Sequence, residues 1–176
     1  ATKSFSVALT MKSAIQKPKK KLLKPKTKPA APRDTAPPAF FNADVLGAEA
    51  AAAAQQSFAS AHPYTYVKLH GLLDESRLLK VRNELAQLRR TFKETDLFKV
   101  FQTGDLANID PNEPLHAAEL SETIALREAL YSDAFRGFVR RVTGCAPLIG
   151  QTDLSCNVYS QGGHLLCHDD VIGTRC

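Results

Sequence analysis

The sequence predicts an α+β protein in which several helices precede a small sheet. Apolar residues at positions 78, 81, 85, 88 and 92 recur at steps of three and four, which gives a helix one continuous apolar face. Residues 154–159 instead alternate between apolar and polar side chains, as in a strand that is buried on one side. Helical patterns first and strand patterns afterwards are typical of the α+β class.

The first elements follow from local signals. Residues 44–61 are rich in alanine and predict a helix, with Asp44 as its N-cap. Residues 64–73, YTYVKLHGLL, carry β-branched and aromatic residues in alternation and predict a strand. Asp74 then caps the helix whose apolar positions run from Leu78 to Phe92.

The middle of the chain predicts a loop and two further helices. Residues 94–114 form the loop, which contains a short apolar piece at 97–101. Ser121 is the expected cap of a helix that runs to Tyr131. A second helix covers 133–142, and Gly144 suits the left-handed position after its end.

Strands dominate the end of the chain. Leu154, Cys156 and Val158 share one predicted face, and Tyr159 lies on the opposite, polar face. The turn signal QGG at 161–163 precedes HLLCHDD, which we expect to return as a second strand. Two or three strands do not close a core, so the sequence predicts a sheet that is incomplete at the C-terminus.

The charge of the chain is divided unevenly. Ten of the 23 basic residues lie in 1–33, where no acidic residue occurs, so the remainder has 13 basic and 18 acidic residues. The Lys- and Pro-rich residues 12–38 favour disorder. We therefore predict a basic disordered tail at 1–43 and a mildly acidic domain at 44–176, which argues against direct nucleic-acid binding by the domain.

Localisation signals in the sequence are few. KPKKKLLKPK in the tail is typical of a nuclear-localisation or polyanion-contact segment, or of a solvating tail without an address. We expect a nuclear or cytoplasmic protein. The sequence contains no apolar run near 18 residues, so no membrane partner is expected.

The tripeptide His168-Asp169-Asp170 is the most informative motif for the chemistry of the chain. Alternate residues of a strand project to the same side, so His168 and Asp170 are expected to point together. Two histidines and one carboxylate form the facial triad of non-haem Fe(II) oxygenases, and His-x-Asp supplies two of these three ligands. The same residues also fit a surface hydrogen-bonding pair or a zinc site completed by a cysteine. Cys167 points away from His168, so we predict a packed thiol there.

The ending YSQGGHLLCHDDVIGTR resembles the 2-oxoglutarate- and Fe(II)-dependent dioxygenases. Within them, LLCHDD and the upstream DLFKVFQTGDL at 96–106 resemble the ribosomal prolyl 3,4-dihydroxylases, which are related to the yeast translation-termination and polyadenylation factor. The resemblance covers about residues 64–175. It implies that the strands begin a double-stranded β-helix of the jelly-roll or cupin type.

The resemblance also implies an activity and its site. His168 and Asp170 match the first two iron ligands of the family, and Tyr159 matches a tyrosine that faces the 2-oxoglutarate pocket. From the residues alone, Tyr159 is equally a half-buried strand tyrosine. The implied cofactors are Fe(II), 2-oxoglutarate and ascorbate. The implied substrate is a proline of a small-subunit ribosomal protein, which links the activity to translation.

The family pattern continues beyond Cys176, where it has a second iron-binding histidine and a basic residue for 2-oxoglutarate. We therefore expect this chain to be the N-terminal part of the catalytic domain, inactive as it stands. The alternative is a non-catalytic binding module whose basic tail directs it to the nucleus or to ribosomes.

Overall fold

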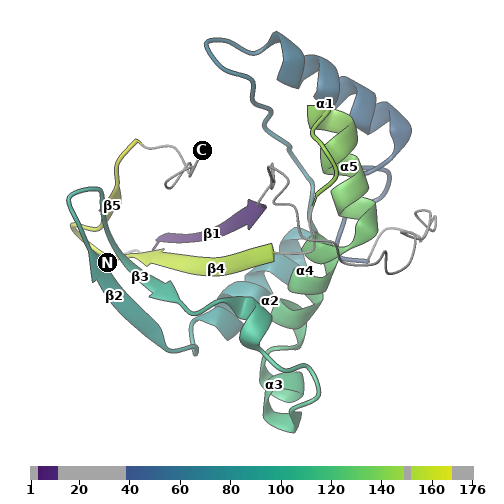
Figure 1. The fold of residues 1–176 in the computed structure, drawn as a ribbon. Coiled ribbons are helices and arrows are strands. Elements are labelled where there is room, and N and C mark those ends of the chain that lie inside the picture. Colours follow the sequence, from purple (N-terminus) through teal and green to yellow (C-terminus); the bar gives the residue numbers. More distant parts are fainter. Residues whose placement is uncertain (1–3, 12–38, 149–151, 168–176) are drawn as a thin grey trace, which may run out of the picture.

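The computed structural model describes residues 4–11, 39–148 and 152–167. Groups of helices lie between groups of strands along the chain (Figure 1). Their bounds are β1 Ser4–Met11, α1 Ala48–Ser60, α2 Glu75–Leu85, β2 Arg90–Glu94, β3 Phe98–Thr103, the 3-10 helix η1 Leu106–Asn108, α3 Pro114–Glu119, α4 Ser121–Tyr131, α5 Asp133–Thr143, β4 Thr152–Tyr159 and β5 His164–Leu165.

The strands form one antiparallel sheet with the order β1-β4-β3-β2. β4 lies between β1 and β3, so segments from the two ends of the chain are neighbours in the sheet. The combination of helices with an antiparallel sheet agrees with the predicted α+β class. The sheet does not begin only near the C-terminus, as expected, because three of its strands precede β4 in the chain.

β5 differs from its prediction as a strand that returns along β4. It pairs with β3, through Phe98 with Leu165 and Lys99 with His164. At Lys99 one edge of β3 is already paired with Glu94 of β2. β5 must therefore pair with the other edge of β3, the edge that also pairs with β4. The two strands follow one another along β3 and are separated by the turn at 160–163. Gly163 fits there because a Cβ atom would lie 2.9 Å from the Ser160 carbonyl oxygen.

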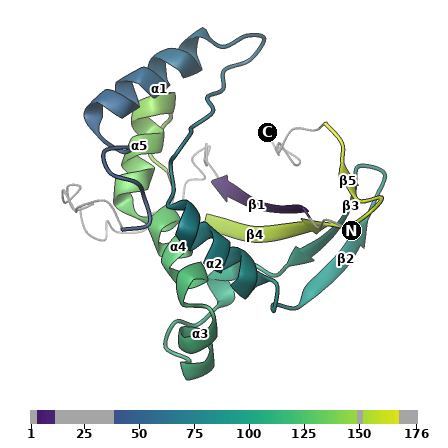
Figure 2. The same cartoon turned by 180° about the vertical axis from the view of Figure 1, so that it is seen from behind.

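The helices lie together beside the sheet in both views (Figures 1 and 2). α1 packs against α5, α2 against α4, and α4 also contacts α5. The buried apolar side chains of these helices and of β4 form one continuous core. None of the helices in the described part of the chain is long and apolar enough to cross a membrane.

Two predicted helix ends are confirmed, and a third is not. The Asp74 carboxylate accepts a hydrogen bond from the Arg77 amide at the start of α2. The Ser76 hydroxyl and this amide lower the pKa of Asp74, so its capping contribution is lost only as pH falls through that lowered value. Gly144 ends α5 with a φ of 66°. Asp44 does not cap α1, which starts after Gly47; the Asp44 carbonyl instead accepts a bond from the Gly47 amide.

Three predictions for the middle of the chain were wrong. Residues 64–73 do not form a strand, and only Leu73 makes a bridge, with Phe41. The predicted loop at 94–114 contains most of a hairpin of β2 and β3. Phe92 belongs to β2 rather than to the preceding helix, because α2 ends at Leu85. Phe92 pairs with Phe101 across the hairpin instead of continuing the apolar face of the helix.

The predicted tail differs from the structure near both of its ends. β1 falls at Ser4–Met11, where pairing with β4 supplies partners that the local sequence does not reveal. Phe40 and Phe41 are 1% and 7% exposed and belong to the core, although they precede residue 44. Residues 12–38, predicted to be disordered, lie outside the described residues. The division into a tail and a domain stays a prediction.

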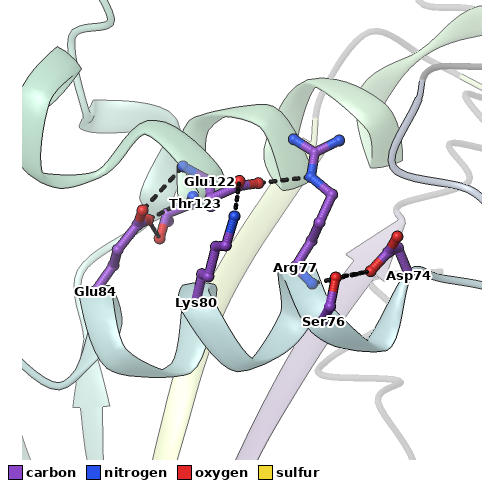
Figure 3. A network of polar contacts seen from close by, with 7 residues as sticks. All are labelled: Asp74, Ser76, Arg77, Lys80, Glu84, Glu122 and Thr123. Carbon is purple, nitrogen blue, oxygen red and sulfur yellow. Dashed lines mark hydrogen bonds and ion pairs between the residues drawn. The ribbon is translucent and has the colours of Figure 1, made fainter.

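One carboxylate connects α2 to the first turn of α4 (Figure 3). Glu84 accepts hydrogen bonds from the amides of Glu122 and Thr123, at 3.0 and 2.7 Å, and from the Thr123 hydroxyl at 2.7 Å. Glu122 in turn pairs with Arg77 at 2.7 Å and with Lys80 at 3.5 Å. Ser121 therefore does not cap α4 as predicted; a side chain from another helix binds the free amides of its first turn.

We expect Glu84→Ala to lower the free energy of unfolding by about 1–3 kcal/mol, because it leaves two helix amides and the buried Thr123 hydroxyl without their acceptor. Urea titration followed by circular dichroism measures this loss. The matched control is Glu128→Ala, an exposed glutamate of α4, for which a change within about 0.5 kcal/mol is expected. Equal unfolding midpoints for the two variants would contradict the capping role.

Candidate functional site on the sheet

The two sides of β4 differ in chemistry, as the alternation predicts. Leu154, Cys156 and Val158 are buried in the core with the helices. Their neighbours Ser155 and Asn157 project to the other side of the sheet, where both accept hydrogen bonds from Gln102. β4 therefore has one apolar side and one polar side, and Asn157 on the polar side is also buried.

A row of polar side chains crosses three strands on that surface. Gln102 of β3 donates through Nε2 to Asn157 Oδ1 at 2.9 Å and to Ser155 Oγ at 3.2 Å. Its Oε1 accepts a hydrogen bond from Lys93 Nζ of β2. We call Lys93, Gln102, Ser155 and Asn157 the polar ladder. Backbone pairing of Gln102 with Asn157 holds its centre in register.

The polar ladder leaves mainly hydrogen-bond donors for a ligand. Its two amide oxygens, Gln102 Oε1 and Asn157 Oδ1, are occupied within the ladder. The Nδ2 group of Asn157 and two of the three N–H groups of Lys93 take no part in it. Donors next to a positive charge favour an acceptor with negative charge, such as a carboxylate.

Tyr159 lies at the end of β4 on the same side as the polar ladder. It is the next alternate residue after Asn157, and it is half-buried. If the β3–β4 register is continued by one residue, Tyr159 stands beside Val100, which pairs with Lys93 on its other side. Its predicted contact with a cosubstrate stays a prediction.

Side chains of β3 and of the loop after it also bind backbone amides of β4. Backbone pairing between the two strands stops at Gln102, and the next amide, of Cys156, donates to the Thr103 hydroxyl at 2.9 Å. The Leu154 amide donates to the Asp105 carboxylate at 3.4 Å. Two side chains thus replace backbone acceptors and fix the position of the strand that carries Tyr159.

The predicted metal ligands His168 and Asp170 lie outside the described residues. Within the described ranges, no group of three histidine, cysteine, aspartate or glutamate side chains is arranged to hold a metal ion. Cys167 is exposed rather than packed as predicted, because β5 ends two residues earlier. The described chain runs along β3 up to this point, where the Leu166 amide donates to the Leu97 carbonyl at 2.9 Å.

Comparison with known proteins identifies the family. Prolyl 3,4-dihydroxylase OGFOD1 of Ostreococcus tauri is 51% identical to this chain over 123 residues, which make up 69% of the chain. The chain belongs to the prolyl 3,4-dihydroxylase family. Prolyl 3-hydroxylase OGFOD1 of Xenopus laevis is also similar, with 31% identity over 114 residues. The relationship suggested by LLCHDD and by residues 96–106 is thereby confirmed.

This chain corresponds to only part of its relatives. It spans 24% of the Ostreococcus protein and 20% of the Xenopus protein. No family model matches the sequence.

The polar ladder was not predicted from the sequence. Lys93 and Gln102 lie in a region predicted to be helix end and loop, so their shared face could not be recognised. One sequence pattern could have indicated the polar ladder. Apolar and polar residues alternate both around Phe101 and around Val158, as expected for two neighbouring strands. Thr103 and Asp105 show that residues 96–106 contribute by positioning β4.

Burial should make Cys156 the slowest of the described cysteines to react. Its thiol is fully buried, and this burial raises its pKa, with Arg90 acting in the opposite direction. A raised pKa leaves less reactive thiolate near neutral pH. With iodoacetamide at pH 8, peptide mass spectrometry should find exposed Cys167 modified well before Cys156. The same reaction in guanidinium is the control, and similar native rates would contradict the packing of β4.

Proposed function

We propose that this chain forms part of the catalytic domain of a prolyl hydroxylase that uses Fe(II), 2-oxoglutarate and O2. The observation that carries the proposal is the 51% identity to a prolyl 3,4-dihydroxylase. In this proposal the sheet is the start of a double-stranded β-helix, and β4 and β5 precede the proposed metal ligands in the chain. The proposal extends to a proline in a ribosomal protein as substrate and to ascorbate as a supporting reductant.

His168 and Asp170 are proposed to bind the metal through one imidazole nitrogen and one carboxylate oxygen. These are ligand types of the facial triad, which keeps positions open for cosubstrate and oxygen. When bound, Fe(II) with 2-oxoglutarate and oxygen supplies the oxidising chemistry that hydroxylates a C–H bond. The residues of this chain contribute binding and orientation.

Tyr159 and the polar ladder are proposed to hold the cosubstrate. A phenolic hydroxyl donates to a carboxylate, and the donors of Lys93 and Asn157 that the polar ladder does not use lie on the same side of the sheet. This donor set fits the acceptor-only chemistry of an ionised dicarboxylate. Thr103 and Asp105 support the site indirectly, because their side chains hold the backbone of β4.

The Lys- and Pro-rich residues 12–38 are proposed to direct the protein to the nucleus or to ribosomes. Their positive charge would favour polyanionic partners. This role is independent of the catalytic proposal, so a chain without hydroxylase activity would retain it.

Activity can be tested with the full-length native protein that contains this sequence. A proline-containing peptide from the decoding-centre region of a ribosomal protein should gain oxygen, detected by mass spectrometry, together with succinate. His168→Ala and Asp170→Ala should each lower the rate by more than about 100-fold, since even outer partners of metal ligands account for about 10- to 100-fold. Full activity of both variants would overturn the assignment of metal ligands.

Tyr159→Phe tests the cosubstrate site separately. Loss of one hydrogen bond to a charged group corresponds to about 1.5–3 kcal/mol, so the KM for 2-oxoglutarate should rise by about tenfold or more. Tyr64→Phe is the control, because Tyr64 is 71% exposed in another part of the fold. An unchanged KM in Tyr159→Phe would exclude Tyr159 from the cosubstrate pocket.

A further inference from the structure

A cavity lies on the side of the sheet opposite the polar ladder. Its volume is about 390 Å³, within the range of about 300–1,000 Å³ that is usual for small-ligand sites. It is formed where residues 88–90, at the start of β2, meet the middle of β3 and the end of β4. Its lining residues are Leu88, Arg89, Arg90, Phe101, Val158 and Ser160.

The cavity has an apolar wall that extends onto exposed aromatic surface. Leu88, buried Val158 and Phe101, which is 36% exposed, all line the cavity. The ring of Phe92 lies 5.1 Å from that of Phe101, measured between centroids, and is 45% exposed. Large apolar side chains that remain this exposed beside a cavity favour a ligand with an apolar body.

Two guanidinium groups give the cavity a positive charge. Arg90 donates through Nη2 to the Ala86 carbonyl at 3.0 Å, which holds its guanidinium at the end of α2. Arg89 is exposed. Among the described residues, neither arginine forms an ion pair. The basic residues that do form ion pairs are Arg77, Lys80, Lys99 and His116. The remaining N–H groups of both arginines suit a carboxylate, which they can bind in bidentate fashion.

We propose that this cavity binds a small organic anion that consists of a carboxylate and an apolar or aromatic body. The carboxylate is bound by Arg89 and Arg90, with the Ser160 hydroxyl as a further donor, and the body packs on Phe101 and Val158. The site is separate from the proposed cosubstrate site, because Val158 and Tyr159 project to opposite sides of β4. The two sites share a strand but no lining residue, so each can fail without the other.

Three probes separate the two features of the proposed ligand. The ¹⁵N-labelled chain is titrated with naphthalene-2-carboxylate, with the neutral naphthalene-2-carboxamide, and with acetate, while amide signals are followed by NMR. The carboxylate should give saturable shifts at Arg89, Arg90 and Ser160. The carboxamide should bind about tenfold more weakly, as expected for loss of one charge-assisted hydrogen bond, and acetate should give no saturable shift.

Variants then test the residues. Arg89→Ala should weaken carboxylate binding about tenfold and leave carboxamide binding unchanged. Phe101→Ala should weaken both naphthalene probes. The matched control is Arg82→Ala, an exposed arginine of α2 that does not line the cavity and should bind like the parent chain.

Several outcomes would overturn the proposal. Equal affinities for the carboxylate and the carboxamide would show that the arginines do not bind the ligand's charge. This comparison uses the parent chain only, so it does not depend on whether a variant folds. Shifts confined to residues outside the cavity would place the probe elsewhere. Equal effects of Arg89→Ala and Arg82→Ala would show a general charge effect, and saturable binding by acetate would show an anion site without an apolar requirement.

Discussion

The carboxylate of Glu84 makes the contact on which the arrangement of helices and sheet depends. It binds the free amides at the start of α4 from a residue 38 positions earlier in the chain. The negative charge of Glu84 also interacts favourably with the positive end of the α4 helix dipole. With α2 and α4 joined in this way, Val81 and Leu85 of α2 are held in the core that β4 completes. The polar contact between these two helices therefore supports the core against which β4 packs.

β3 has a corresponding role within the sheet. Its backbone pairs with β2, β4 and β5, and its side chains act on both sides of the sheet. Gln102 organises the polar ladder on one side, while Thr103 accepts the Cys156 amide on the other. These contacts help to position β4, which gives residues 96–106 a structural role next to Tyr159.

The two sides of β4 present different ligand chemistries from adjacent residues. Tyr159 shares one side with a ladder whose unused groups are hydrogen-bond donors. Val158 faces the other side, where a cavity combines an apolar wall with two arginines. Both surfaces favour anions, although residues 34–176 together carry more acidic than basic side chains. Local placement of a few cations, rather than the net charge, decides what each surface can bind.

The sequence by itself determined the elements whose signals are local. Asp74 and Gly144 mark helix ends because capping and left-handed geometry depend on neighbouring residues only. The alternation at 154–159 likewise revealed which side of β4 is apolar, and the LLCHDD motif indicated the family. The hairpin at 90–103 was not determined in this way, because Phe92 fits a helical spacing as well as a strand.

Only the tertiary structure decided which distant segments meet. β1 was hidden in a basic N-terminal segment, because a strand at a sheet edge is stabilised by its partner rather than by its own sequence. The cap of α4 comes from Glu84, and the polar ladder requires the register between Gln102 and Asn157. Such contacts join residues that are far apart in the chain, so no local pattern encodes them.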